Sequence, residues 1–355
     1  MNHHPLSKRI GLFLGPILFL IIQFTSISFI SDTADTVIAA AVWMVIWWIT
    51  EAVSISVTAL LPLLLFPLFK IMPMDEVGAN YGSKIVFLFF GGFILALALE
   101  KVNLHKRIAL TIIKLTGTSP DRVILGFMIA TAFMSMWISN TASTVVMLPI
   151  AMSVINLLIN DEDGFSKPDK NFALSVMLGI AFAANAGGIA TVIGTPPNSV
   201  LIGLLENEYN IQISFVKWMS FGLPFSVLLV SIVYLILVKI LFPCKGLVFG
   251  TSNSVINNEL NMLGKLSRKE KHVLVIFAVI VSLWIFRSLI NQLIPSLGLN
   301  DTMISIFGAI VLFAIPHNLK KGNFILQWKD TQKLAWGILI LFGGGLALAK
   351  GMSTS

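Results

Sequence analysis

Neutral oxygen-bearing side chains gather at two interruptions of otherwise apolar segments. The first interruption holds Ser135, Ser139, Asn140 and Thr141, and the second is the stretch Gly194–Asn198. Ser135 and Ser139 are four residues apart, so they share one face of a helical segment. An uncharged polar group in hydrocarbon is costly unless it is bonded, and a cluster of them at one depth therefore predicts a binding site.

Hydroxyl, amide and carbonyl oxygens are hard ligands that suit a hard cation such as sodium, and they bind it without a buried formal charge. A half-helix that begins at this tip would direct free N–H groups and its positive dipole end toward a substrate carboxylate. In the second interruption, Pro196 and Pro197 remove donors, break the helix and free nearby carbonyls. Gly194 there permits close approach, and Thr195 offers a hydroxyl.

The structural alternative is that such groups only pack and hydrogen-bond between helices. Taken singly, Thr131, Ser143 and Thr144 favour that interpretation, and so does the lone polar residue Asn185. The tripeptide at the first interruption, taken together with the broken second segment, favours a functional site.

The elements that must position these residues are membrane-spanning helices. Of 355 residues, 56% are hydrophobic and 12% charged, and the mean hydropathy is +0.90. A soluble domain carries about 25% charged residues, so the solvent of this chain must be largely lipid. Apolar stretches recur at lengths that suit helices rather than the short alternating strands of a barrel. The sequence therefore predicts an all-α membrane protein.

We expect nine spans, one interfacial segment and one re-entrant hairpin. The hairpin is 122–158, with its tip at the first interruption, and the basic, amphipathic segment 101–118 lies along the interface. The first span is not a signal peptide, because no small-residue cleavage pattern follows it. The spans are 10–30, 37–54, 56–72, 85–100, 171–205 (the broken one), 216–242, 273–292, 301–316 and 334–349.

Charge in the loops predicts the topology. The net charge of +7 does not indicate a nucleic-acid partner, because the basic residues lie in short loops, where they orient spans. With a cytoplasmic N-terminus, the basic loops 101–122 and 243–272 both fall inside, provided that the hairpin enters and leaves on one side. The single cysteine, Cys244, excludes an intrachain disulfide.

Residues 88–96 and 340–348 form an internal repeat at an offset of 252 residues. Five spans separate the two starts, so the copies cross in opposite directions, which is typical of inverted-repeat secondary transporters. The alternative is that Gly-rich apolar runs recur by chance. If the repeat is real, the counterpart of Ser139 falls at position 391, beyond Ser355. We then expect the chain to be C-terminally incomplete and to lack a second hairpin.

Acidic residues are sparse in the predicted spans, where only Glu51 and Glu100 come near, at span ends. Proton-coupled transporters usually carry Asp, Glu or His inside the membrane, so sodium coupling is favoured. We do not expect an enzyme, because no buried acid, base or metal cluster accompanies the serines.

At these residues the sequence resembles the divalent anion/sodium symporter family, which carries dicarboxylates, tricarboxylates or sulfate. The matching stretches lie in order along nearly the whole chain and are 47–52 (WWITEA), 90–92 (FGG), 135–142 (SMWISNTA) and 194–198 (GTPPN). The resemblance implies a scaffold domain that holds a homodimer and a transport domain that moves as an elevator. Residues 142–144 follow the signature where some exchangers carry a basic residue, which favours symport.

The resemblance also implies the roles of the site residues. A sodium ion would bind Ser135, Ser139, Asn140 and the carbonyl of Gly194. The substrate carboxylate would contact Ser139, Asn140, Thr141 and Thr195. The expected domains are scaffold spans with the interfacial helix in 1–118, a transport domain in 119–242, a cytoplasmic loop in 243–272 and the start of the second repeat in 273–355.

The sequence therefore predicts sodium-coupled symport of a small dicarboxylate such as succinate by a multi-pass protein of the cell membrane. Sulfate or another inorganic dianion is one alternative. A truncated membrane protein that does not transport is another, since family members carry a second Ser-Asn-Thr hairpin that these residues lack. The identity of the dianion and the sodium stoichiometry stay open.

Overall fold

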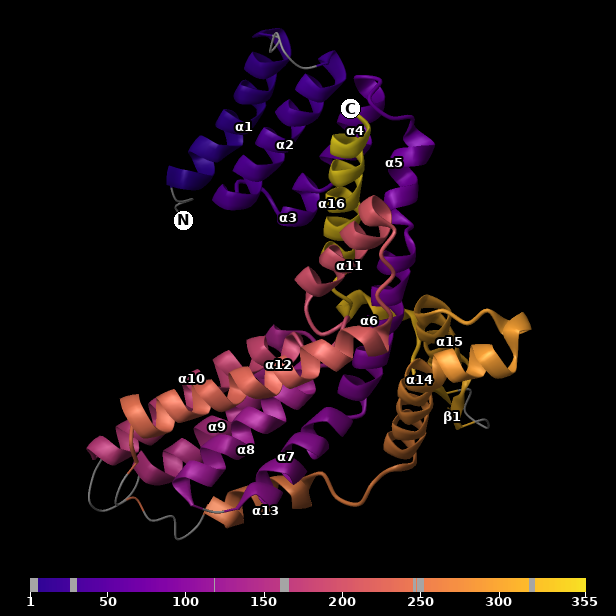
Figure 1. Cartoon of the computed structure of the whole chain (residues 1–355). Helices are drawn as coiled ribbons and strands as arrows, with labels where there is room; N and C mark the ends of the chain where they lie inside the picture. Colours follow the sequence, from indigo (N-terminus) through magenta and orange to yellow (C-terminus); the bar gives the residue numbers. More distant parts are fainter. Residues whose placement is uncertain are drawn as a thin grey trace. The chain divides into compact units, whose positions relative to one another are not determined.

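The described parts of the chain form helices and one short pair of strands (Figure 1). The computed structural model describes residues 6–25, 31–117, 119–159, 166–244, 247, 252–318 and 323–355. The first helices are α1 (Leu6–Thr25), α2 (Asp32–Thr50), α3 (Ile55–Thr58), α4 (Leu61–Leu68), α5 (Met74–Tyr81), α6 (Lys84–Lys101), α7 (Leu104–Thr116) and α8 (Pro120–Ser135). They are followed by α9 (Asn140–Ile159), α10 (Lys167–Gly188), α11 (Pro196–Tyr209), α12 (Phe215–Leu235), α13 (Ser252–Met262), α14 (Arg268–Leu293), α15 (Asp301–Ala314) and α16 (Trp336–Thr354).

The remaining regular elements are short. A π-helical stretch, Ile236–Leu241, continues α12, and single 3-10 turns lie at Pro295–Leu297 and Trp328–Lys333. Strands β1 (Pro316–Asn318) and β2 (Asn323–Phe324) pair antiparallel after α15. They are a small departure from the all-α prediction.

Seven helical segments within the described residues are long and apolar enough to cross a bilayer. They are Leu6–Thr25, Thr33–Thr50, Met74–Lys101, Lys167–Gly188, Phe215–Leu241, Arg268–Leu293 and Trp336–Thr354. This confirms a helical membrane protein with many spans. The expected span 301–316 is a shorter helix, α15, and the last five residues of the expected span 10–30 lie outside the described residues.

The segment 56–72 was expected to be one span, and this is wrong in detail. It forms two short helices, α3 and α4, that are separated at Ala59-Leu60. Pro62 lies in the first turn of α4, where its missing N–H needs no helical partner. A continuous helix would need that N–H to bond the carbonyl four residues earlier, so the proline favours a new start.

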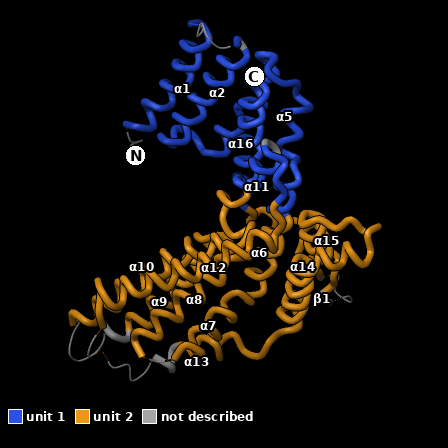
Figure 2. The backbone as a smooth tube through the Cα atoms, viewed as in Figure 1, with its two compact units in different colours: residues 1–90, 200–212, 335–355 blue, residues 91–199, 213–334 orange. Residues whose placement is uncertain are grey.

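The chain folds as two compact units (Figure 2). Unit 1 comprises residues 1–90, 200–212 and 335–355, and α1 and α2 pack side by side within it. Its core buries Phe19 of α1, Met44 of α2 and Phe66 of α4 in one cluster. The division into scaffold and transport domains stays a prediction, because those domains are defined by which parts move.

Within unit 1, which holds only residues 88–90 of the first repeat copy, α16 lies against the end of α5 and the start of α6. The Phe89 and Phe342 rings are 4.8 Å apart, and the Phe90 and Trp336 rings are 5.8 Å apart. Gly343 packs on Tyr81. As the residue number along α16 rises from 336 to 343, the residue number of the contacting partner falls from 90 to 81. Helix α16 therefore runs antiparallel to this earlier segment.

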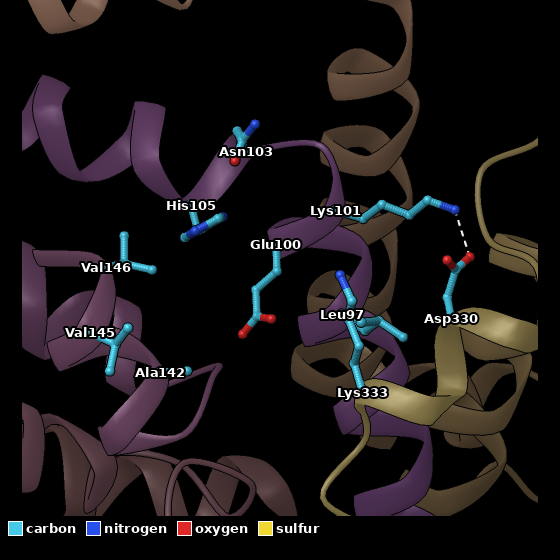
Figure 3. Close-up of a pocket in the computed structure, with 10 residues that line it drawn as sticks. All are labelled: Leu97, Glu100, Lys101, Asn103, His105, Ala142, Val145, Val146, Asp330 and Lys333. Carbon is cyan, nitrogen blue, oxygen red and sulfur yellow. Dashed lines mark hydrogen bonds and ion pairs between the residues drawn. The ribbon is translucent and has the colours of Figure 1, made fainter.

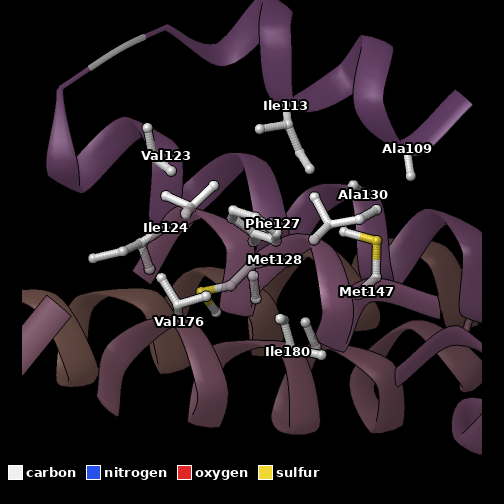
Figure 4. Packing of buried hydrophobic residues seen from close by; sticks show 14 of the residues in the cluster. Ala109, Ile113, Val123, Ile124, Phe127, Met128, Ala130, Met147, Val176 and Ile180 are labelled. Carbon is white, nitrogen blue, oxygen red and sulfur yellow. The ribbon is translucent and has the colours of Figure 1, made fainter. Parts of the chain in front are cut away.

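Unit 2 comprises residues 91–199 and 213–334. Its main core lies between α7, α8, α9, α10 and α12, and Figure 4 shows Phe127 and Met128 of α8 among residues of the neighbouring helices. The packing is close enough that a Cβ at Gly187 of α10 would clash with the backbone of Ala132.

Helices α8 and α9 form a helical hairpin. The core cluster combines Ile124 and Phe127 of α8 with Met147 and Val154 of α9, and Figure 4 shows Met147 beside Ala130. A chain that continued straight on from α8 would carry Met147 about 25 Å beyond Ala130, at 1.5 Å per residue. The chain therefore reverses within the turn 136–139.

The two basic loops that flank the hairpin lie together. Arg107 of α7 donates to Glu270 at 2.6 Å and to the carbonyls of Gly264 and Leu263 at 2.9 and 3.0 Å. Lys106 pairs with Glu259 of α13 at 2.8 Å. In the expected cytoplasmic loop 243–272, residues 245, 246 and 248–251 lie outside the described residues.

Candidate functional site

The turn of the hairpin positions the first predicted site residues. Helix α8 ends at Ser135 and α9 begins at Asn140. The Ser139 hydroxyl accepts from the backbone N–H of Ala142 at 3.2 Å, which is the bond of an N-cap residue. Ser139 thus starts α9, and Asn140 falls in its first turn because of this cap.

Three oxygens meet at the base of this turn. The Ser135 hydroxyl is 2.7 Å from Asn140 Oδ1 and 2.6 Å from the carbonyl oxygen of Ala184 in α10. Ser135 is fully buried. Its hydroxyl carries one hydrogen and can donate to only one of the two acceptors. The Ala184 carbonyl also accepts the helical N–H of Gly188, because α10 extends to that residue. Three neutral oxygens therefore meet at one point and keep free lone pairs, an arrangement that could also ligate a cation.

Two glycines bring backbone next to this cluster. A Cβ at Gly188 would clash with Asn140 Oδ1, and it would lie 3.2 Å from Cβ of Thr195. A Cβ at Gly194 would lie 2.5 Å from the Gly188 carbonyl oxygen and 3.0 Å from that of Ser135. Glycine is needed at both positions for this close approach, as predicted for Gly194.

The break between α10 and α11 is closed mainly by side-chain donors. Asn198 donates to the carbonyls of Gly188 and Thr191 at 2.9 and 2.8 Å, and Ser199 donates to Val192 at 2.9 Å. The indole of Trp218 donates to Ile189 at 2.9 Å. Pro196 and Pro197 are the first two residues of α11, and because they have no N–H they cannot donate to the carbonyls that precede them. The Val192 carbonyl, four residues before Pro196, accepts from Ser199 instead.

The start of α9 presents backbone N–H groups beside the oxygen cluster. The first N–H groups of a helix have no helical partner, so those of Asn140 and Thr141 are available to an acceptor. Thr141 is exposed, while Ser139 and Thr195 are half-buried. Helix α11 also begins here, but its two leading prolines contribute no N–H groups.

The structure thus brings together Ser135 and Asn140 by direct contact, and Gly194 and Thr195 by way of Gly188. Ser139 lies in the same turn, and within the described parts of the chain its hydroxyl has one hydrogen-bond partner, the N–H of Ala142. The described residues contain no cluster of His, Cys, Asp or Glu that could hold a metal ion. Neutral oxygens are the ligands that this site has.

Sequence reasoning missed two contributors to the site. Asn185 was expected to pack and hydrogen-bond between helices, and its Oδ1 does accept from Asn140 Nδ2 at 3.0 Å; that its partner is a predicted site residue was not foreseen. The Ala184 carbonyl was not considered at all. The signal for Asn185 was its position, because it lies three residues before Gly188 on the helix that packs against the hairpin.

Aromatic rings hold the turn from the other side. Trp137 stacks on Phe215 with ring centroids 6.3 Å apart, and it makes an edge contact of 4.8 Å with Phe277. Phe215 in turn stacks on Trp284 at 4.4 Å. Such aromatic pairs add about 0.5–1.5 kcal/mol each beyond the area that they bury. The turn is therefore fixed to α12 and α14.

A cavity of about 340 Å³ lies next to the hairpin but does not include the oxygen cluster (Figure 3). It is lined by Leu97, Glu100, Lys101, Asn103, His105, Ala142, Val145, Val146, Asp330 and Lys333. Lys101 pairs with Asp330. The cavity thus follows the joint between α6 and α7 and one apolar face of α9.

His105 closes that joint. Its Nδ1 lies 3.0 Å from the Leu99 carbonyl, near the end of α6, and donates to it in the neutral ring. Burial lowers the pKa of His105 below its ordinary value of 6.5, and nearby Lys106 lowers it further, while the bond to Leu99 opposes the shift. The ring is therefore neutral at physiological pH.

Comparison with known proteins identifies relatives along the whole chain. The family described as "Sodium:sulfate symporter transmembrane region" matches residues 7–355. The sodium-dependent dicarboxylate transporter SdcS of Staphylococcus saprophyticus is 42% identical over 357 residues, which cover 98% of this chain and 68% of that protein. SdcS of Staphylococcus aureus strain USA300 is 42% identical over 354 residues, with the same coverage.

Proposed function

Because the chain belongs to the sodium:sulfate symporter family, we propose that it carries small dicarboxylates such as succinate across the cell membrane together with sodium. The relatives named as sodium-dependent dicarboxylate transporters support this choice of substrate and of coupling ion. One observation of the structure carries the proposal: the neutral oxygens of Ser135, Asn140 and Ala184 converge at the turn of the hairpin.

Sodium binds at this cluster in the proposed mechanism. The ligands are Ser135, Ser139, Asn140 and the carbonyl of Gly194, to which the Ala184 carbonyl is added by its contact with Ser135. A bound cation would bridge these oxygens and would thereby hold the hairpin against α10. Sodium is thus a transported co-substrate, and its binding prepares the turn for the anion.

The dicarboxylate binds beside the cation. One carboxylate is bound by Ser139, Asn140, Thr141 and Thr195, and it faces the first N–H groups of α9. The positive end of that helix and the bound sodium both attract the anion. Because the anion and the cation stabilise each other in one site, they move together, which is the basis of symport.

The proposed membrane arrangement is an inverted repeat with a re-entrant hairpin. The antiparallel contact between the two repeat copies supports the inversion. The reversal of the chain at 136–139 and the contact between the two basic loops support a hairpin that returns to the cytoplasmic side. The family resemblance extends this proposal to a homodimer with an elevator-type movement.

The test is uptake of labelled succinate by the full-length protein in liposomes, with and without an inward sodium gradient. Ser135→Ala removes one oxygen of the cluster and is expected to raise the half-saturating sodium concentration about tenfold, or about 1.4 kcal/mol. Ser143→Ala is the matched control, since its buried hydroxyl has no hydrogen-bond partner in the described structure. An equal rate of succinate uptake with and without the sodium gradient would refute the proposal.

Sulfate is the second candidate substrate, because the matching family is described by sodium:sulfate symport. The same liposomes decide between the two anions by competition. A dicarboxylate carrier is expected to lose labelled succinate uptake to unlabelled succinate at concentrations where sulfate has no effect. Equal or stronger competition by sulfate would replace the dicarboxylate in the proposal.

A further inference from the structure

Asn185 is the middle member of an oriented chain of hydrogen bonds beside the oxygen cluster. Its Nδ2 donates to the carbonyl of Ala181, one turn earlier in α10, at 3.0 Å. Its Oδ1 accepts from Asn140 Nδ2 at 3.0 Å. Asn140 Oδ1 then lies 2.7 Å from the Ser135 hydroxyl. These contacts connect a backbone group of α10 to the cluster through two side-chain amides.

The backbone carbonyl determines the direction of this chain. A carbonyl can only accept, so the amide of Asn185 must turn its NH2 toward Ala181 and its oxygen toward Asn140. Asn140 must therefore turn its own NH2 toward Asn185. Its oxygen then faces the cluster, and neither amide can flip without leaving two acceptors or two donors face to face.

Without this restraint, the inverted orientation of the Asn140 amide would be favoured when no cation is bound. The Ser135 hydroxyl can give its single hydrogen either to Asn140 Oδ1 or to the Ala184 carbonyl. In the absence of a cation, an inverted Asn140 amide would donate its NH2 to the Ser135 oxygen, and the hydroxyl would donate to Ala184. That inversion would direct a positive dipole at the place where sodium binds.

We propose that Asn185 is a positioning residue that holds the Asn140 amide with its oxygen toward the cation, and thereby sets the affinity for sodium. This inference rests on the proposed function, since it assigns a partner to the same site. Asn185 itself is exposed on α10 and does not touch Ser135 within the described hydrogen bonds. It acts through Asn140 rather than as a ligand.

The test compares substitutions of Asn185 in the full-length protein. Asn185→Leu removes the acceptor that faces Asn140 while it keeps a side chain of similar size. Asn185→Asp keeps an oxygen toward Asn140 but loses the donor to Ala181, so it tests the acceptor alone. The matched control is Asn171→Leu on the same helix, whose amide also donates to a backbone carbonyl, that of Pro243, at 2.9 Å.

Two quantities are measured for each variant at constant ionic strength. The first is the sodium concentration for half-maximal succinate uptake in liposomes, and the second is the rise in melting temperature of the purified protein with sodium alone. We expect Asn185→Leu to raise the half-saturating sodium concentration about tenfold with little change in the maximal rate. Asn185→Asp and Asn171→Leu are expected to stay within about threefold of the parent.

The inference is overturned if Asn185→Leu leaves the sodium dependence within about twofold of the parent, or if Asn185→Asp weakens sodium binding as much as Asn185→Leu does. Should Asn185→Leu fail to fold, Asn185→Ala removes the same acceptor and replaces it. If the parent protein takes up no succinate in response to sodium, the proposed function fails. The melting series still reports on the amide in that case.

Discussion

Two helix breaks in this chain place backbone and side-chain oxygens at a helix end. The two breaks differ in the hydrogen-bond donors that they supply to those oxygens. In unit 1, the carbonyl of Ala59 between α3 and α4 accepts a hydrogen bond from the Tyr81 hydroxyl. Gly344 of α16 packs directly against the same carbonyl. In unit 2, the Ser135 and Asn140 oxygens at the hairpin turn meet the Ala184 carbonyl with one hydrogen among them.

The difference lies in the balance of donors and acceptors. A buried oxygen without a donor costs about 1–3 kcal/mol, so a break that is only structural brings a donor to each oxygen. The break between α10 and α11 does this too, through Asn198, Ser199 and Trp218. At the hairpin turn, by contrast, the Ser135 hydroxyl has two acceptors for its one hydrogen, and this supports the proposal that a cation binds there.

Filling the open break should have the largest effect. Gly188→Ala places a methyl group against Asn140 Oδ1, with Cβ of Thr195 only 3.2 Å away. The Asn140 amide is held by its hydrogen bonds to Ser135 and Asn185 and cannot move aside cheaply. We therefore expect sodium-dependent succinate uptake to fall by at least about 100-fold, or about 2.7 kcal/mol. Uptake in liposomes measures this.

The matched control is Gly345→Ala on α16, where an added Cβ has no neighbour within 4 Å. It should leave uptake unchanged, and it should raise the stability slightly because alanine favours a helix. Normal uptake by Gly188→Ala would contradict the placement of the site at this turn.

Opening the closed break should affect stability but not sodium binding. Tyr81→Phe removes the donor to the Ala59 carbonyl, and we expect the free energy of unfolding to fall by about 1–2 kcal/mol. Thermal melting in detergent measures the loss, and Tyr209→Phe, at an exposed tyrosine, serves as control. A changed half-saturating sodium concentration in Tyr81→Phe would show that the two breaks are not distinct in role.

A fourth break, between α6 and α7, sharpens the comparison because its donor, His105, titrates. His105 donates to Leu99, and burial lowers its pKa below 6.5. The stability is therefore complete above about pH 6.5, and it falls as the pH decreases, because the unfolded chain then binds a proton that the folded chain resists, by at most about 1.4 kcal/mol per pH unit.

We expect His105→Leu to flatten this part of the dependence of melting temperature on pH between 6.5 and more acidic values. His272→Leu, at an exposed histidine, is the control and should leave the dependence unchanged. An unaltered slope in His105→Leu would show that His105 is not buried in the neutral form. This is the smallest of the expected effects.

Much of the fold and part of the site were predictable because they depend on local sequence. Apolar segments of span length predict the helices, and the polar or glycine-rich residues at 135–141 and 194–198 predict the interruptions. Ser139 could be placed as the start of a helix because serine favours the N-cap position. The split of 56–72 was also signalled by Pro62, although length and hydropathy favoured a single span.

Only the tertiary structure decided which groups surround the first of those interruptions. A backbone carbonyl such as that of Ala184 gives no signal in the sequence. Asn185 reaches Asn140 only because α10 packs against the hairpin with one particular rotation and depth. Apolar periodicity indicates which face of a helix is buried, but it does not specify the residue 45 positions away that this face meets. The sequence by itself determined that polar oxygens gather at the break. The packing of α10 decided that the Ala184 carbonyl joins them, so that the Ser135 hydroxyl has two acceptors.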